Sequence, residues 1–133
     1  MIVVDTNTWA DYFNGARTTW TDRLESAVEH REVLAVLPII VTEVLQGFRY
    51  VHGFEYARRF LVELPILHPT LETHINAARL LRLLREKGVT VQGTVDCVIA
   101  QTCIEKGAEL LSSDSDFRHI ARFTTLSLWT AEK

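Results

Sequence analysis

Short apolar runs alternate along the chain with longer segments in which apolar residues recur every three or four positions. The runs predict strands at residues 2–5, 33–37, 64–67, 110–112 and 126–129. The segments between them predict helices at residues 8–13, 18–31, 38 to about 50, 55–61, 70–87, 94–105 and 115–120. Because Pro65 cannot donate a ladder hydrogen bond, the strand at 64–67 is expected at an edge or in a brief pairing.

Proline and glycine mark the ends of several expected helices. Pro38 is suited to the first turn of a helix, and Gly53 is expected to close the stretch that begins there. Thr70 is expected to cap the long helix, which Gly88 ends. Gly107 is expected to end the helix at 94–105. These signals divide the chain into short elements joined by short connections.

The order of the elements predicts the fold class. Strands that alternate with helices predict an α/β protein, with a central parallel sheet of four to five strands between two helical layers. A chain of 133 residues, 47% of them hydrophobic, is expected to form a single domain over residues 1–133. No apolar stretch is long enough for a membrane span and no secretory signal is evident. Together with two cysteines interpreted as reduced core residues, Cys97 and Cys103, this suggests a cytoplasmic protein.

The charge balance excludes few classes of function. A formal net charge of −3 argues against a general nucleic-acid binder, which normally has a basic excess. It does not exclude a nuclease, because basic residues can be concentrated locally. Arg79, Arg82 and Arg85 recur every third residue of the long helix. They form either a solvated helix face or a ridge that contacts an RNA or DNA backbone.

Acidic residues recur near the expected strand ends. Asp5 ends the first strand, and Glu43 lies in the first turns of the helix after the second. Asp96 begins a helix, and Asp114 and Asp116 follow the strand at 110–112. In a parallel sheet these positions share the carboxyl edge, where ligands bind in open α/β folds.

Clustered carboxylates need a positive group among them to stay ionised. Mg²⁺ or Mn²⁺ meets this need with oxygen ligands, and can polarise a phosphoryl oxygen and activate a water. The expected reaction is therefore hydrolysis of a phosphodiester. Each acid alone also has a simpler explanation: Asp5 could bond the next turn, Asp96, Asp114 and Asp116 suit helix starts, and Glu43 could lie at the surface.

Four stretches carry a family resemblance. They are IVVDTNTW at 2–9, PIIVTEVLQG at 38–47, TVQGTVDCVIA at 90–100 and LLSSDSDF at 110–117. In this order and spacing, the chain resembles the PIN-domain ribonucleases, and within them the VapC-type toxins. The resemblance covers essentially the whole length and implies a PIN-like fold.

The resemblance assigns roles to individual positions. Asp5, Glu43, Asp96 and Asp114 match the acidic quartet that holds Mg²⁺ or Mn²⁺, and Asp116 matches a further acid that could bind a second ion or support the first. Asn7 matches a small polar residue that orients a metal-bound water or a neighbouring acid, and Thr94 matches a hydroxyl position near the site. Many relatives carry Arg and then Ser or Thr where this chain has Gln92 and Gly93, so substrate preference cannot be copied from them.

The resemblance also implies an activity and partners. It implies an endoribonuclease in which a metal-activated water attacks RNA, acting as the toxin of a type II toxin–antitoxin pair. A VapB-type antitoxin is expected to silence a toxin homodimer in a hetero-oligomer, which contacts DNA only through the antitoxin. Six aromatic residues that follow the first two acids are either core or a groove for such a partner; they are Trp9, Tyr12, Phe13, Phe48, Tyr50 and Phe54.

Two other classes of function compete with the nuclease. One is a catalytically inactive PIN-like module that acts only as a partner of a DNA-binding repressor. The four retained acids argue against it. The other is a phosphoacceptor signalling domain, which would need a paired acid near the first strand and a lysine after a late strand. Asp5-Thr6-Asn7 has a single acid, and no lysine follows the strand at 110–112.

Overall fold

A computed structural model describes residues 1–90 and 93–131 and confirms the predicted α/β class. The strands form one sheet in the order β2-β1-β3-β4, in which β1 pairs with β2 and β3 pairs with β4 in parallel. The elements are β1 (Ile2–Val4), α1 (Thr6–Phe13), α2 (Thr19–Glu29), β2 (Leu34–Ala35), α3 (Pro38–Gln46), α4 (Val51–Leu61), α5 (Leu71–Glu86), α6 (Thr94–Lys106), β3 (Glu109–Leu111), α7 (Ser115–Phe123) and β4 (Ser127–Leu128). None of the helices in the described ranges has the length and apolar character needed to cross a bilayer.

The expected strand at 64–67 forms only an isolated parallel bridge between Val36 and Ile66, which is the brief pairing predicted from Pro65. The predicted helix boundaries around Gly53 are wrong. The helix opened by Pro38 ends at Gln46, and Gly53 lies inside α4 instead of closing that stretch. A Cβ atom at position 53 would lie 3.0 Å from Cδ1 of Phe48, so the glycine makes room for a ring and does not end a helix.

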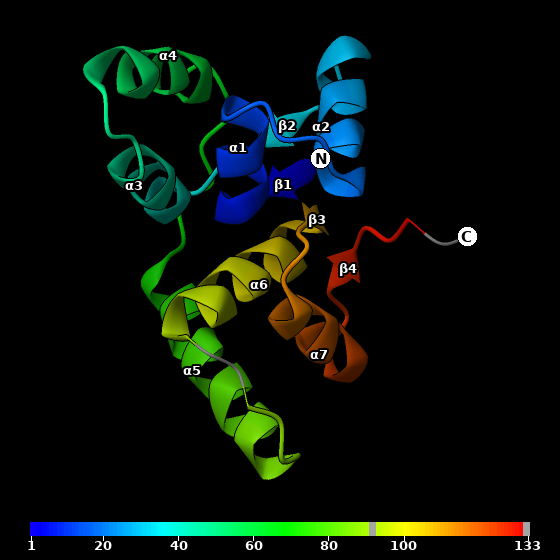
Figure 1. Cartoon of the computed structure of the whole chain (residues 1–133). Helices are drawn as coiled ribbons and strands as arrows, with labels where there is room; N and C mark the ends of the chain where they lie inside the picture. The colour runs from blue at the N-terminus through cyan, green and yellow to red at the C-terminus, as the bar shows by residue number, and fades with distance from the viewer. Residues whose placement is uncertain (91–92, 132–133) are drawn as a thin grey trace. The chain divides into compact units, whose positions relative to one another are not determined.

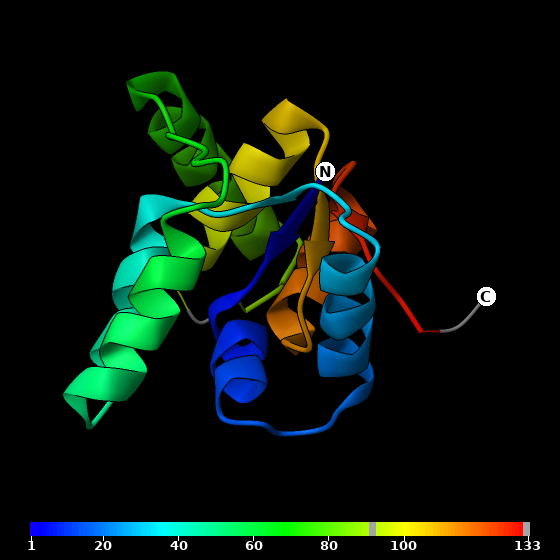
Figure 2. The ribbon, with the colours of Figure 1, turned by 90° about the horizontal axis from the view of Figure 1, so that it is seen from above.

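The first compact unit comprises residues 1–68 and 111–113. Strand β1 is fully buried and pairs with β2 in the register Ile2 to Leu34 and Val3 to Ala35. Helix α1 packs against α2 and α3, and α3 packs against α4 (Figures 1 and 2). The core of this unit is built from apolar side chains of all these elements, with Trp9 completely buried.

The second unit comprises residues 69–110 and 114–133, of which 91–92 and 132–133 lie outside the described residues. Helix α5, capped by Thr70 as predicted, packs along α6, and α6 packs against α7 (Figure 1). Strands β3 and β4 pair in parallel. Gly107 ends α6 with φ +64°, a conformation that glycine adopts without a steric penalty. Cys97 and Cys103 are buried and lie outside any disulfide, as predicted.

Candidate metal centre

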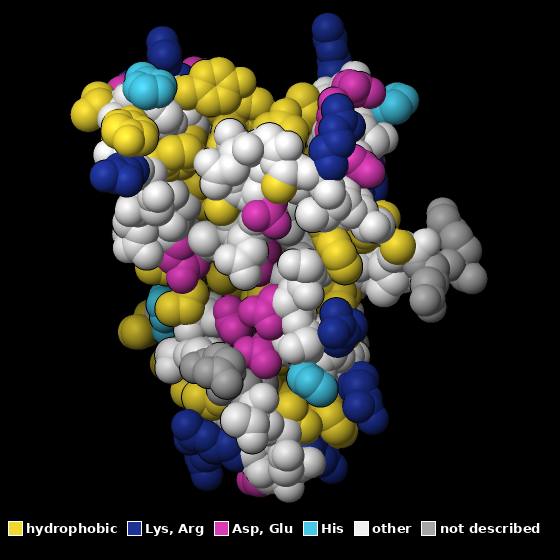
Figure 3. Space-filling model, viewed as in Figure 1, with side chains coloured by type: hydrophobic (Ala, Val, Ile, Leu, Met, Phe, Trp, Pro, Cys, Tyr) yellow, Lys and Arg dark blue, Asp and Glu magenta, His cyan; other side chains and the backbone are white. Residues whose placement is uncertain are grey.

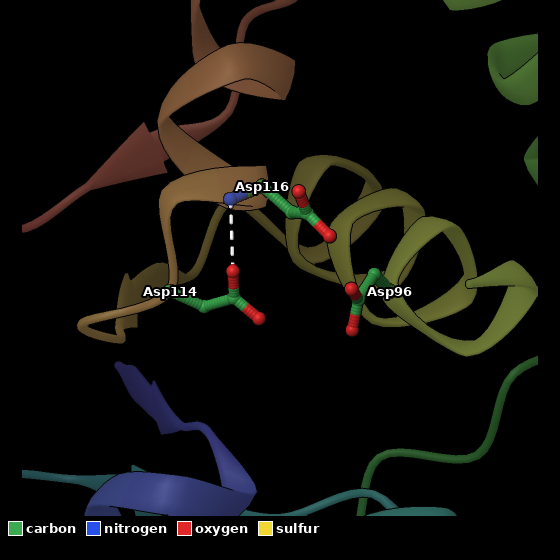
Figure 4. Close-up of side chains that lie close together, drawn as sticks. All are labelled: Asp96, Asp114 and Asp116. Atoms are coloured by element: carbon green, nitrogen blue, oxygen red, sulfur yellow. Dashed lines mark hydrogen bonds between the residues drawn. The ribbon is translucent and has the colours of Figure 1, made fainter. Parts of the chain in front are cut away.

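Three of the predicted acids meet in the second unit. Asp96, Asp114 and Asp116 each offer a carboxylate oxygen, and these atoms all lie within 4.8 Å of one another. Figure 4 shows the three side chains directed toward a common space, Asp96 from α6 and the other two from the start of α7. In the space-filling view, acidic side chains gather over these two helices (Figure 3).

Helix starts place this acid triad, which is defined as Asp96, Asp114 and Asp116. Asp114 is the N-cap of α7, and its Oδ1 accepts a hydrogen bond of 2.9 Å from the backbone N–H of Asp116. Asp96 lies in the first turn of α6. The positive ends of both helix dipoles favour negative charge at these positions. Asp114 therefore caps α7, as its simpler explanation predicted. Its second carboxylate oxygen is directed toward the other two acids of the triad (Figure 4).

The donor set of the triad suits a hard divalent cation. Three carboxylates this close repel one another, and oxygen ligands are the kind that Mg²⁺ and Mn²⁺ prefer. Cys97 follows Asp96 directly and is buried. Burial, more than the Asp96 and Asp116 carboxylates, raises the pKa of its thiol to about 11.

The other two acids of the predicted quartet lie in the first unit and are linked through Thr6. Asp5 is buried, and its two oxygens accept hydrogen bonds of 2.8 Å from the backbone N–H of Thr6 and from the hydroxyl of Ser112. The Thr6 hydroxyl donates a 2.8 Å bond to Oε1 of Glu43 on α3. One residue at the start of α1 thus holds both carboxylates.

Thr6 and Ser112 have contacts that the sequence argument did not assign. Both lie inside the motif stretches, but only the acids, Asn7 and Thr94 were given roles there. The signal was present in the sequence: each is a hydroxyl residue within two positions of a predicted acid. What the sequence could not show is that Ser112 reaches a carboxylate 107 residues earlier in the chain.

Replacing Thr6 with valine tests the link between the first two acids. We expect Thr6→Val to lower the free energy of unfolding by about 0.5–1.5 kcal/mol, because the half-buried Glu43 loses its hydroxyl donor. Urea unfolding followed by circular dichroism measures this. Thr8→Val is the matched control on the same helix, since the Thr8 hydroxyl is buried without a partner among the described residues. A loss at Thr8 as large as that at Thr6 would contradict the assignment.

The remaining predicted site residues lie outside these two groups of acids, and most of them are exposed. Asn7 and Thr94 are exposed, near the start of α1 and at the start of α6. Gly93 is the N-cap of α6, while Gln92 lies outside the described residues. Arg79, Arg82 and Arg85 are all exposed on α5.

The six aromatic residues that follow the first two acids were interpreted as either core residues or a groove for a partner, and the structure places them in both settings. Trp9 is entirely buried, so it belongs to the core. Tyr50 is 62% exposed, and Tyr12, Phe13, Phe48 and Phe54 are half-buried. Neither reading holds for the whole set, because some of the rings fill the core and others reach the surface.

Comparison with known proteins agrees with this architecture. The family model described as PIN domain matches residues 2–123. The chain therefore belongs to the PIN domain family. Within that family, Ribonuclease VapC11 of Mycobacterium tuberculosis is 32% identical over 134 residues, a match that covers 95% of this chain and 96% of that protein. The resemblance to the VapC group is thereby confirmed.

Solved structures show the same fold. VapBC2 from Rickettsia felis, determined bound to a DNA fragment from its promoter, matches with a TM-score of 0.75 and 21% identity, over 98% of this chain and 100% of that chain. VapC20 of Mycobacterium tuberculosis, described as a Sarcin-Ricin loop cleaving toxin, matches with a TM-score of 0.65 and 18% identity, over 89% of this chain and 93% of that one. At 21% and 18% identity, these matches show a shared fold and nothing beyond it.

Proposed function

We infer that this protein is a metal-dependent endoribonuclease and the toxin of a type II toxin–antitoxin pair, folded as one PIN domain. The observation that carries the inference is the acid triad, whose oxygens lie within 4.8 Å of one another in a chain of the PIN domain family. The similarity to proteins named as VapC ribonucleases supports RNA as the substrate. We expect single-stranded or looped RNA, whose backbone is accessible.

The proposed catalytic set is Asp5, Glu43, Asp96 and Asp114, with Asp116 as a further ligand. Its two parts are each held by their own hydrogen bonds, Asp5 and Glu43 through Thr6, and Asp114 by the start of α7. Ser112, whose hydroxyl donates to Asp5, comes two residues before Asp114 in the chain. We propose Asn7 and Thr94 as supporting residues beside this set.

The proposed site residues have two roles: the carboxylates bind the metal ion, and Thr6 and Ser112 orient two of the carboxylates. When bound, Mg²⁺ or Mn²⁺ supplies an electrophile that withdraws charge from a phosphoryl oxygen and makes water a better nucleophile. The carboxylates provide the ligand oxygens for that ion. Thr6 and Ser112 fix the orientation of Asp5 and Glu43 before substrate binds, so less reorganisation is required during the reaction.

We propose that a VapB-type antitoxin is the protein partner, and that the toxin forms a homodimer within a hetero-oligomer. The support is the similarity to VapBC assemblies, one of them bound to DNA from its own promoter. In this proposal DNA is contacted only through the antitoxin, and the toxin acts in the cytoplasm.

The α5 arginines are proposed as auxiliary RNA contacts. Arg82 and Arg85 are exposed, and a guanidinium can contact a phosphate in two places. Arg79 is less available, because it bonds Asn76 at 2.8 Å and lies 3.7 Å from a carboxylate oxygen of Glu72. We therefore expect Arg82 and Arg85 to contribute more than Arg79.

Dependence on metal is the direct test of the proposed activity. We expect the purified chain to cleave single-stranded RNA with Mn²⁺ or Mg²⁺, to stop in EDTA, and to resume when Mn²⁺ is added in excess. Gel analysis of a labelled RNA measures this. Cleavage that is insensitive to EDTA would overturn the metal-dependent mechanism. Absence of both cleavage and Mn²⁺ binding by calorimetry would favour the inactive PIN-like binding module.

A further inference from the structure

A pocket in the first unit lies outside the proposed catalytic set. Its volume is about 660 Å³, within the range of small-molecule sites. We call it the aromatic pocket and define it by six of its lining residues: Phe13, Phe48, Arg49, Tyr50, Tyr56 and Arg59. It lies where the end of α1 meets the connection between α3 and α4 and the helix α4 itself. In Figure 3, hydrophobic and basic side chains gather over α4.

The rings of the pocket present flat apolar faces. Phe13 contacts the rings of Phe48 and Tyr56 edge to face, at centroid distances of 6.2 and 6.1 Å. Tyr50 and His52 lie nearly parallel, with an interplanar angle of 15° and a centroid distance of 6.0 Å. Tyr56 is 60% exposed and meets Phe13 only edge to face, so its ring retains a surface on which a further planar group can stack. Tyr50 is 62% exposed, and its ring is already in contact with His52 and Arg49.

The pocket lining carries two arginines, Arg49 and Arg59. Among the described residues that line it there is no carboxylate, and no ion pair of Arg49 or Arg59 is found in that part of the chain. The Arg49 guanidinium lies over the Tyr50 ring, 5.6 Å from its centroid. Arg59 donates only to the backbone carbonyl of Glu55, whose carboxylate is paired with Arg58 at 2.9 Å. In a chain of net charge −3, this is a local concentration of positive charge.

We propose that the aromatic pocket binds one unpaired nucleotide of an RNA strand. The base stacks on the exposed ring of Tyr56, and the flanking phosphates contact Arg49 and Arg59. Exposed rings combined with unpaired arginines are the arrangement that binds single strands, because every base has a stacking face and every nucleotide has a charge. An apolar helix would use the rings but not the arginines. The inference rests on the proposed function, since it assumes that the chain acts on RNA.

Binding of a fluorescein-labelled oligouridylate, measured by anisotropy in EDTA so that the strand stays intact, tests the proposal. We expect Tyr56→Leu to weaken binding about 5- to 10-fold through lost stacking. Arg49→Gln and Arg59→Gln should each reduce the slope of log affinity against log NaCl concentration by about 0.7, the value for one phosphate contact on a single strand. Arg58→Gln is the matched control: it makes the same charge change on the same helix, outside the pocket lining. Circular dichroism checks that each variant is folded.

Each alternative has its own outcome. If Arg58→Gln and Arg59→Gln change the slope of log affinity against log NaCl concentration equally, RNA binding depends on overall charge. That result would overturn the proposed nucleotide site. Unchanged RNA affinity in all the pocket variants, with lost affinity for a purified VapB-type antitoxin, would make the pocket a protein-docking surface and also overturn the proposal. If the protein cleaves RNA and the pocket variants bind RNA as wild type does, the proposed nucleotide site is wrong and the proposed nuclease activity stands. If RNA binding depends on the pocket and no cleavage occurs, the proposed nuclease activity is wrong and the nucleotide site stands.

Discussion

Asp96→Asn is expected to lower the rate of RNA cleavage in Mn²⁺ by a factor of about 10²–10³, the usual cost of removing one preorganised electrostatic group from an active site. The substitution keeps the size of the side chain and removes one of three carboxylates whose oxygens lie within 4.8 Å. It therefore weakens ion binding without emptying space in the core. Single-turnover cleavage of a labelled RNA measures the rate.

A second readout separates metal binding from folding. Because an ion that binds only the folded state stabilises it, Mn²⁺ should raise the melting temperature of the wild-type protein. It should raise that of Asp96→Asn much less. In EDTA the variant should melt close to the wild-type temperature, since relief of repulsion among the triad opposes the loss of the helix-dipole interaction.

Asp22→Asn is the matched control for this variant. Asp22 lies in the first turn of α2, as Asp96 lies in the first turn of α6, so both substitutions remove the same favourable interaction with a helix dipole. We expect Asp22→Asn to cleave RNA at the wild-type rate and to keep the Mn²⁺ shift. Wild-type cleavage by Asp96→Asn would remove the triad from the mechanism.

The largest effect on stability is expected at Trp9. Trp9→Ala should lower the free energy of unfolding by about 3–5 kcal/mol, because it empties a fully buried site. The indole is stacked on Phe13 at a centroid distance of 5.6 Å and meets Phe60 edge-on at 5.6 Å, so both rings lose a packing partner. For a domain whose total stability is on the order of 5–15 kcal/mol, this is a large fraction. Urea unfolding followed by far-ultraviolet circular dichroism measures the change.

Trp9→Phe serves as the control for the origin of this stability. The indole N–H has no hydrogen-bond partner among the described residues, so replacing it with a smaller ring sacrifices volume but no hydrogen bond. We expect a loss of only about 1 kcal/mol, consistent with a partly filled cavity. A loss as large as that of Trp9→Ala would show that the indole group itself, and not aromatic packing, stabilises this core.

Several aspects of this protein could be read from local sequence. The alternation of apolar runs with helical periodicity predicted the α/β class, since burial imposes a period of two or about 3.6 on any segment that packs against a core. The long helix and its cap at Thr70 were confirmed because their signals lie within a few residues of one another. The PIN resemblance rested on contiguous motifs, and it too was confirmed.

Some residue types fit more than one structural role, and only the packing of the tertiary structure shows which role each one has. A glycine can end a helix or admit a neighbouring ring, and Gly53 does the second because Phe48 lies against it. An aromatic residue can fill a core or line a surface. Trp9 and Tyr50 have opposite positions although both follow a predicted acid by a few residues.

The acids themselves, and the chemistry they suit, were determined by the sequence alone, because residue type dictates which ligand atoms a chain can offer. Only the tertiary structure brought Asp96 to Asp114 and Asp116, attached Ser112 to Asp5, and used Thr6 to reach Glu43. Such contacts depend on how separate elements pack, and no local pattern encodes the distance between two side chains far apart in the chain.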